Sequence, residues 1–167
     1  IYGGFVEMHR GSRDDGSDAF AEPVRGNDAF ARDVRLVVAV TTEKAKETLS
    51  TIGMERTAET SPYFGAWVAT SEPDLAAAKS AIAAGDLDAL GEVTERSCLT
   101  MHASALAARP AVVYFLGITI DGFHAVQRMR KDGVRASFTC DAGPHIKALT
   151  DAAQADEVAR RLREVPG

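Results

Sequence analysis

Cysteine and long apolar runs are scarce in this sequence. Only two of its 167 residues are cysteines, Cys98 and Cys140, and their separation fits neither a CxxC pair nor a metal-finger spacing. We therefore expect two small buried thiols in a reducing compartment, and no disulfide. No stretch approaches eighteen consecutive apolar residues, so the sequence predicts no membrane span.

An excess of basic residues is also lacking. The net charge is −5 and the sequence pI is about 5.4, which argues against a general nucleic-acid or anionic-membrane binder. An anionic small-molecule substrate stays possible, because a local pocket can be positive on a negative protein. With 46% hydrophobic residues, the chain can form one domain, or one domain and a strip of another.

The N-terminus has no initiator methionine and no signal-peptide pattern of basic, apolar and small residues. The opening Ile-Tyr-Gly-Gly-Phe is typical of a chain that enters an element already under way. We therefore expect a fragment whose N-terminal part is missing.

Three extended segments are predicted in the first forty residues. Tyr2 to His9 alternates in polarity, with an irregularity at Gly3-Gly4, and Asp18 to Val24 forms a short extended run. Val34 to Val40 is almost continuously apolar, which predicts a strand covered on both faces. The polar run from Gly26 to Asp33 is the expected domain boundary.

Helix signals dominate the middle of the chain. Ser61-Pro62 predicts one helix start, and Ser71 with Asp74 resembles a second capping box that places Pro73 in a first turn. That helix is expected to end at Gly85. Asp86 then caps a longer helix that ends before Pro110.

The last third combines helices and strands. Val112 to Leu116 fits a strand or a buried connection, and helices are expected over Thr119–Lys131 and Ala155–Val165. Val134–Cys140 and His145–Thr150 are predicted strands joined by a tight turn. This order indicates an α+β sandwich with helices on one face of an antiparallel sheet.

Asp141 is the first candidate for chemistry. It follows an apolar strand in Thr139-Cys140-Asp141-Ala142-Gly143-Pro144, where a glycine lets the backbone turn close to a ligand. A carboxylate at a strand's end is well placed to meet a substrate. Aspartate before glycine and proline is also common turn chemistry, and the spacing alone favours an ordinary turn.

Two further features have both a functional and a structural interpretation. The segment Lys44 to Met54 carries Lys44, Lys46, Ser50 and Thr51, which suit phosphate binding near a helix start but also suit a solvated helix-capping loop. Met101-His102 lies in the long helix, where a lone histidine is typical of a packed, hydrogen-bonded residue. The other histidines lack metal-ligand spacing with His102, so we assign no metal ligand.

Taken in order, several segments match one known family. Ile1 to Glu7 match the strand that follows its serine-rich phosphate loop, and Ser50-Thr51-Ile52-Gly53-Met54 match its substrate loop. Leu99 to Ala103 match its central helix. Phe138 to Pro144 matches its catalytic-aspartate turn. On these residues the chain resembles the C-terminal half of the diphosphomevalonate decarboxylases of the GHMP kinase superfamily, from Ile1 to about Leu149.

The resemblance implies a reaction and a fold. The family uses ATP and Mg²⁺ to phosphorylate the 3-hydroxyl of mevalonate 5-diphosphate, after which phosphate and carbon dioxide leave and isopentenyl diphosphate forms. Residues 1–32 would end an N-terminal nucleotide-binding domain, and residues 33–167 would form a ferredoxin-like C-terminal domain. The whole protein is expected to be a cytoplasmic homodimer.

The resemblance also implies site residues. Asp141 would act on the 3-hydroxyl as base or orienting group, and Ser50, Thr51 and Met54 would line the substrate. No residue of this chain is assigned to the nucleotide. Ser97 and His145 stand where the family usually has asparagine.

Two alternatives stay open. Relatives that act on mevalonate monophosphates share much of this pattern, so the chain can also belong to a phosphomevalonate decarboxylase that gives isopentenyl phosphate. A ferredoxin-like small-molecule-binding module without catalytic activity is the other alternative.

Overall fold

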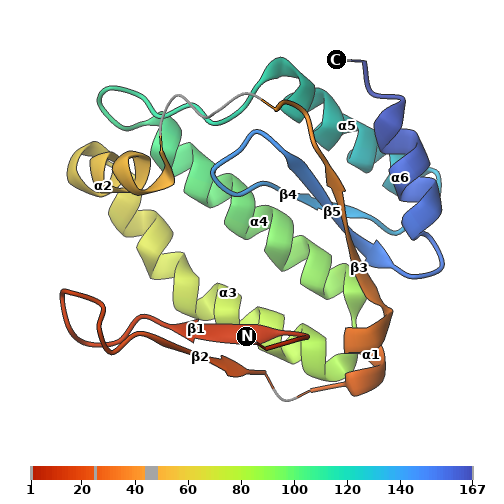
Figure 1. Cartoon of the computed structure of the whole chain (residues 1–167), viewed down its shortest axis with the longest axis horizontal. Coiled ribbons are helices and arrows are strands. Elements are labelled where there is room, and N and C mark those ends of the chain that lie inside the picture. The colour runs from red at the N-terminus through yellow and green to blue at the C-terminus, as the bar shows by residue number, and fades with distance from the viewer. Residues whose placement is uncertain (1, 25, 44–48, 167) are drawn as a thin grey trace.

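The computed structural model describes residues 2–24, 26–43 and 49–166. Figure 1 shows a two-stranded hairpin at one end of the molecule, a larger sheet at the other, and two long helices between them. Along the chain the elements are β1 (Val6–His9), β2 (Phe20–Pro23), α1 (Asp28–Asp33), β3 (Val34–Ala39), α2 (Ser50–Thr60), α3 (Phe64–Ala84), α4 (Leu87–Leu106), α5 (Gly117–Lys131), β4 (Ser137–Thr139), β5 (Ile146–Asp151) and α6 (Ala155–Arg163).

The larger sheet is antiparallel with strand order β3-β5-β4, which confirms the predicted α+β class. Helices α5 and α6 cover one of its faces. The rings of Phe123 on α5 and Phe138 on β4 stack with centroids 4.1 Å apart. Val158 of α6 is buried in the same hydrophobic cluster as Ala148 of β5. This face therefore holds the main core.

Helix α4 lies along the outer edge of β4. The backbone N–H of Phe138 donates to Glu95 Oε1 at 2.9 Å, and that of Cys140 donates to Cys98 Sγ at 3.2 Å. Side chains of α4 thus take the hydrogen bonds that another strand would otherwise make. The expectation of helices on one face fits α5 and α6, whereas α4 covers an edge.

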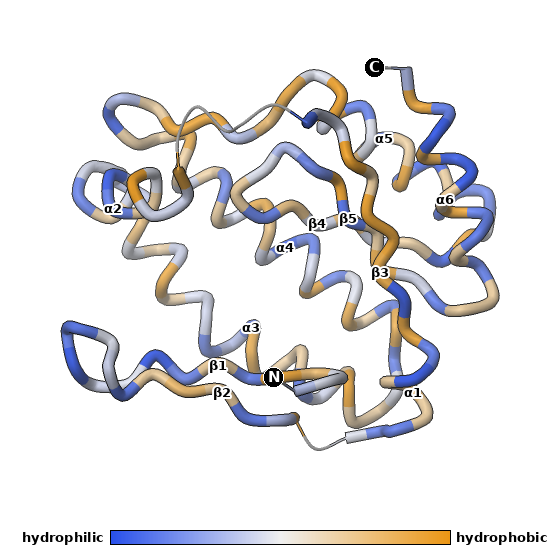
Figure 2. The backbone as a smooth tube through the Cα atoms, in the orientation of Figure 1, coloured by the Kyte–Doolittle hydropathy of each residue, from blue (hydrophilic) through white to orange (hydrophobic). Residues whose placement is uncertain are grey.

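Figure 2 shows strand β3 as mostly hydrophobic along its length. Val37 and Ala39 pack against the main core, but Leu36 and Val38 are 51% and 48% exposed. The expectation that both faces are covered is therefore wrong for this strand in the described structure. The reason is that α4 packs along β4, two strands away, and leaves that face of β3 open.

Helix α3 corrects two expected helix starts. It begins at Phe64, and the Ser61 hydroxyl accepts a hydrogen bond from the Tyr63 N–H at 3.2 Å in the turn before it. It then continues through Pro73, so the second predicted start is wrong. Asp74 is buried and pairs with Arg96 of α4 at 2.7 Å instead of capping. Packing against α4 outweighs the local preference of proline for a first turn.

The boundary between α3 and α4 agrees with the sequence prediction, whereas β1 and β4 are shorter than the predicted strands Tyr2 to His9 and Val134–Cys140. Gly85 ends α3 with a left-handed φ of 69°, and the Asp86 carboxylate accepts from the Ala89 N–H at 3.0 Å to begin α4. Val112 to Leu116 is a connection without strand structure. No helix in the described ranges has the length and apolarity to cross a membrane.

The β1–β2 hairpin packs on α1 and α3. The rings of Phe5 and Phe30 stack with centroids 5.8 Å apart, and Lys79 of α3 forms an ion pair with Glu7 at 2.6 Å. Phe30 also belongs to a second buried cluster, with Ile82 and neighbouring residues of α3 and α4. The segment expected to be a domain boundary forms the short helix α1.

Candidate active site

Asp141 lies on the turn between β4 and β5, close to the end of β4. The Gly143 N–H donates to the Asp141 carbonyl, and Gly143 has a φ of +26°. A Cβ at Gly143 would overlap with the backbone carbonyl of Tyr114, so only glycine fits there. The Asp141 side chain is 67% exposed, and its Oδ2 lies 2.6 Å from Lys147 Nζ on β5. The turn thus presents a carboxylate to solvent beside a cation.

The ends of this turn are held from two sides. His102 Nε2 of α4 donates to the Cys140 carbonyl at 3.0 Å, and Thr119 Oγ1 of α5 donates to the Pro144 carbonyl at 2.8 Å. His102 is 2% exposed, and burial lowers its pKa. The structure therefore confirms His102 as a packed, hydrogen-bonded residue, which positions the Asp141 turn.

Both cysteines are free and buried, as predicted. Burial raises the pKa of Cys98, and it raises that of Cys140 to about 11. They are structural thiols, and their hydrogen bonds fasten β4 to α4.

The predicted substrate residues lie on α2. Ser50 and Thr51 are exposed in its first turn, and Met54 is half-buried one turn later. The N-cap, Leu49, makes no side-chain capping bond, so the structure does not support the interpretation of Ser50 as a helix cap. Lys44 and Lys46, also part of the predicted phosphate-binding segment, lie outside the described residues.

Tyr114 connects α2 to the Asp141 turn. Its buried hydroxyl lies where a Cβ of Gly53 would be, and its carbonyl lies where a Cβ of Gly143 would be. The hydroxyl has no hydrogen-bond partner in the described part of the chain. Sequence reasoning missed this residue. Gly53 and Gly143 were the available signal in the sequence. The missing side chain of Gly53 leaves room for the Tyr114 hydroxyl, and that of Gly143 leaves room for the Tyr114 carbonyl.

His145 follows the turn and faces the end of β3. Its Nδ1 accepts from the Thr41 N–H at 3.3 Å. His145 therefore links the turn to the chain that leaves β3.

A cleft of about 510 Å³ lies between α3 and α4 and reaches the end of β4. Its lining includes Ser97, Met101, Thr139 and Cys140, so one end of it lies at the residues that precede Asp141. Trp67 and Leu75 form part of its α3 wall.

The family model described as the mevalonate 5-diphosphate decarboxylase C-terminal domain matches residues 36–166. The chain belongs to this family. The match confirms the resemblance found in the sequence. It covers β3 to α6 and thus all the candidate site residues on α2 and on the β4–β5 turn.

Individual relatives agree with this assignment. The chain is 31% identical over 157 residues to the diphosphomevalonate decarboxylase of Ganoderma lucidum, covering 90% of this chain and 39% of that one. The crystal structure of the Staphylococcus aureus mevalonate diphosphate decarboxylase superposes with a TM-score of 0.92 and 32% identity, over 100% of this chain and 50% of that one. A complex of MDDEF with MVAPP, AMPPCP and magnesium gives a TM-score of 0.90 and 29% identity, over 98% and 49%.

The chain therefore spans about half the length, or less, of these members of the mevalonate 5-diphosphate decarboxylase family.

Proposed function

We propose that this chain is the substrate-facing half of an ATP-dependent decarboxylase that converts mevalonate 5-diphosphate to isopentenyl diphosphate. Membership of the family supports the reaction class, and the relative crystallised with MVAPP, an ATP analogue and magnesium supports the substrate and cofactors. The observation that carries the proposal is the exposed, cation-paired carboxylate of Asp141, on a turn whose two ends accept hydrogen bonds from His102 and Thr119.

Asp141 is proposed as the catalytic carboxylate. It takes the proton of the substrate's 3-hydroxyl as that oxygen is phosphorylated. The proton then passes from the exposed carboxylate to solvent. The restored negative charge of Asp141 stabilises the positive charge that develops at C3 as phosphate leaves. The bonds from His102 and Thr119 to the two ends of the turn limit its movement, so the carboxylate needs little reorganisation.

Ser50, Thr51 and Met54 are proposed to bind the substrate. The exposed hydroxyls of Ser50 and Thr51 lie in the first turn of α2, where backbone N–H groups and the helix dipole favour anions. Met54 would contact the apolar side of the substrate. Tyr114 packs against both Gly53 and the Asp141 turn, which supports a single site formed from the two elements.

We infer a domain division before β3. Residues 1–32 would end a nucleotide-binding domain, and residues 33–167 would form the C-terminal domain. The family match begins at residue 36, and β1 and β2 pair only with each other in the described structure. The residues that hold ATP and Mg²⁺ would then lie in the nucleotide-binding domain. We further propose that the whole protein is a cytoplasmic homodimer. Light scattering of the full-length protein would measure its mass and so test whether it is a dimer.

The experiment is Asp141→Asn in the full-length protein, with Asp121→Asn as a matched control on the exposed side of α5. Asn keeps the size and suits the same turn but accepts no proton, so turnover should fall by about 10²–10⁴-fold. Substrate affinity and melting temperature should change little. Turnover within a few-fold of wild type would remove Asp141 from the chemistry.

The same assay separates the two candidate substrates. Phosphate and carbon dioxide release are measured with mevalonate 5-diphosphate and with mevalonate 5-phosphate. We expect the diphosphate to be preferred, and a preference for the monophosphate would assign the protein to the phosphomevalonate decarboxylases.

A further inference from the structure

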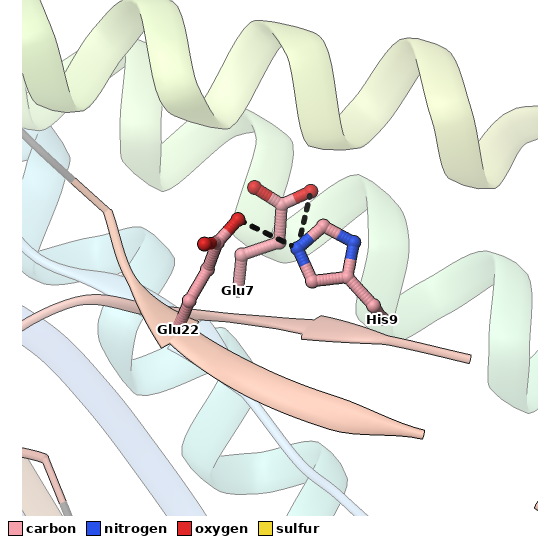
Figure 3. Close-up of side chains that lie close together, drawn as sticks. All are labelled: Glu7, His9 and Glu22. Carbon is pink, nitrogen blue, oxygen red and sulfur yellow. Dashed lines mark hydrogen bonds and ion pairs between the residues drawn. The ribbon is translucent and has the colours of Figure 1, made fainter. Parts of the chain in front are cut away.

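A second group of ionisable side chains lies on the β1–β2 hairpin. Glu7 and His9 are two residues apart on β1, and Glu22 is the cross-strand partner of Glu7 on β2. Side chains two apart on a strand point to the same face, and directly opposed residues share it. Figure 3 shows the three side chains pointing toward one another above the hairpin.

The distances in this group suit a shared ion. His9 Nε2 lies 2.9 Å from Glu22 Oε1 and 3.8 Å from Glu7 Oε1, and one ligand atom from each residue lies within 4.8 Å of the others. Tetrahedral ligands that bind zinc at about 2.0–2.2 Å lie roughly 3.4 Å apart. The Glu22 side chain is 57% exposed, so surrounding residues do not prevent it from adjusting its position when an ion binds.

Neighbouring groups already orient two of the three side chains. Lys79 Nζ binds Glu7 Oε2 at 2.6 Å, so that Oε1 is the oxygen nearer His9. The hydrogen bond from Lys79 lowers the pKa of Glu7 and keeps its carboxylate ionised. The His9 ring stacks on Phe20 with centroids 4.5 Å apart, which fixes its plane. Outer contacts of this kind are what orient ligands in metal sites.

The geometry points to a transition-metal site formed by Glu7, His9 and Glu22, with zinc as the preferred ion and water as the fourth ligand. One imidazole and two carboxylates suit zinc, whereas magnesium and calcium favour oxygen ligands alone. Two carboxylates against one lysine leave a negative charge that a divalent cation offsets. A scan of histidine spacing misses this site because its ligands meet across a strand pair. The site is separate from the proposed catalytic site.

The test is a zinc chloride titration of the full-length protein in phosphate-free buffer, read by competition with a chromophoric chelator. We expect one zinc ion per chain, with affinity at least tenfold lower in His9→Ala and in Glu22→Gln. Glu22 is exposed, so its variant should fold normally. His124→Ala is the matched control, an exposed histidine on α5, and should bind like wild type.

Two results would overturn the site. The first is zinc affinity that is unchanged in both His9→Ala and Glu22→Gln, which would leave the cluster as a hydrogen-bond and ion-pair network only. The second is displacement of zinc by an equal concentration of magnesium, which contradicts a nitrogen-containing ligand set. Cys98 and Cys140 are buried and do not compete for the added zinc.

Discussion

Among single residues, Ser50 offers the clearest distinction between an effect on substrate binding and an effect on protein stability. Its exposed hydroxyl occupies the first turn of α2 and is not the helix cap. Ser50→Ala should leave the melting temperature unchanged or slightly higher, because alanine favours helix. Removing a hydroxyl that contacts a charged group should weaken substrate binding by about 1.5–3 kcal/mol.

Calorimetry with mevalonate 5-diphosphate measures the affinity in the full-length protein, and Ser80→Ala on the exposed side of α3 is the control. Substrate affinity equal to that of the control would exclude Ser50 from the site.

His102 makes stability depend on pH. Burial lowers its pKa from the usual 6.5, so the unfolded chain binds a proton at a higher pH than the folded chain does. The stabilisation that the folded state gains from burying neutral His102 is therefore complete above about pH 6.5. It is lost as the pH falls toward the lower pKa of His102 in the folded protein. His102→Gln keeps a donor for the Cys140 carbonyl but does not titrate.

Urea unfolding at several pH values should show wild type losing stability on acidification and the variant losing less. Parallel pH curves for the two proteins would contradict this account.

Residue by residue, pattern reasoning identified the Asp141 turn, the two buried thiols and the packed His102, because each has a local signature. It missed Lys147 and Tyr114. Lys147 reaches Asp141 through the register of β5, and Tyr114 reaches two glycines through the packing of a loop. Such partners depend on the tertiary structure. The assignment of Asp141, Ser50, Thr51 and Met54 to the site stays a prediction.

At the scale of elements, the contact of α2 with Tyr114 predicts opposite stability changes for two glycine-to-alanine substitutions. In Gly53→Ala the new methyl group would overlap with the buried Tyr114 hydroxyl, which should destabilise the protein by about 1–3 kcal/mol. Gly65→Ala on α3 meets open space and should stabilise it by about 0.5–1 kcal/mol.

Urea unfolding of both variants measures the difference, and we expect opposite signs. A stabilising Gly53→Ala would show that Tyr114 does not hold α2 in place.

Element types were more predictable than element ends. Gly85 and Asp86 carry conformational and capping preferences that fix a boundary locally. The helix start predicted near Pro73 was wrong because the preference of proline for a first turn competes with the packing of α3 on α4. Asp74 and Arg96 form an ion pair in that contact. The open face of β3 could not be predicted either, because the apolar run alone does not determine which helix packs on the strand.

For the whole molecule, we expect the 167-residue chain alone to be inactive. It spans half or less of the length of its relatives, and the family resemblance assigns nucleotide binding to residues that this chain does not match. Carbon dioxide release with ATP and mevalonate 5-diphosphate should be absent from this chain and present with the full-length protein. Turnover by the 167 residues alone would place the nucleotide site within them.

The pairing of β3 with β5 sets an order for folding during synthesis. Their partners, such as Ala39 and Ile146, lie more than a hundred residues apart. At about 5–20 residues per second, a ribosome makes the intervening chain in roughly 5–20 seconds. Helices α3 and α4 can pack on each other within that interval, while the apolar β3 has no strand to join. The sheet is therefore expected to form last, and β3 is the segment most exposed to chaperones while the chain is made.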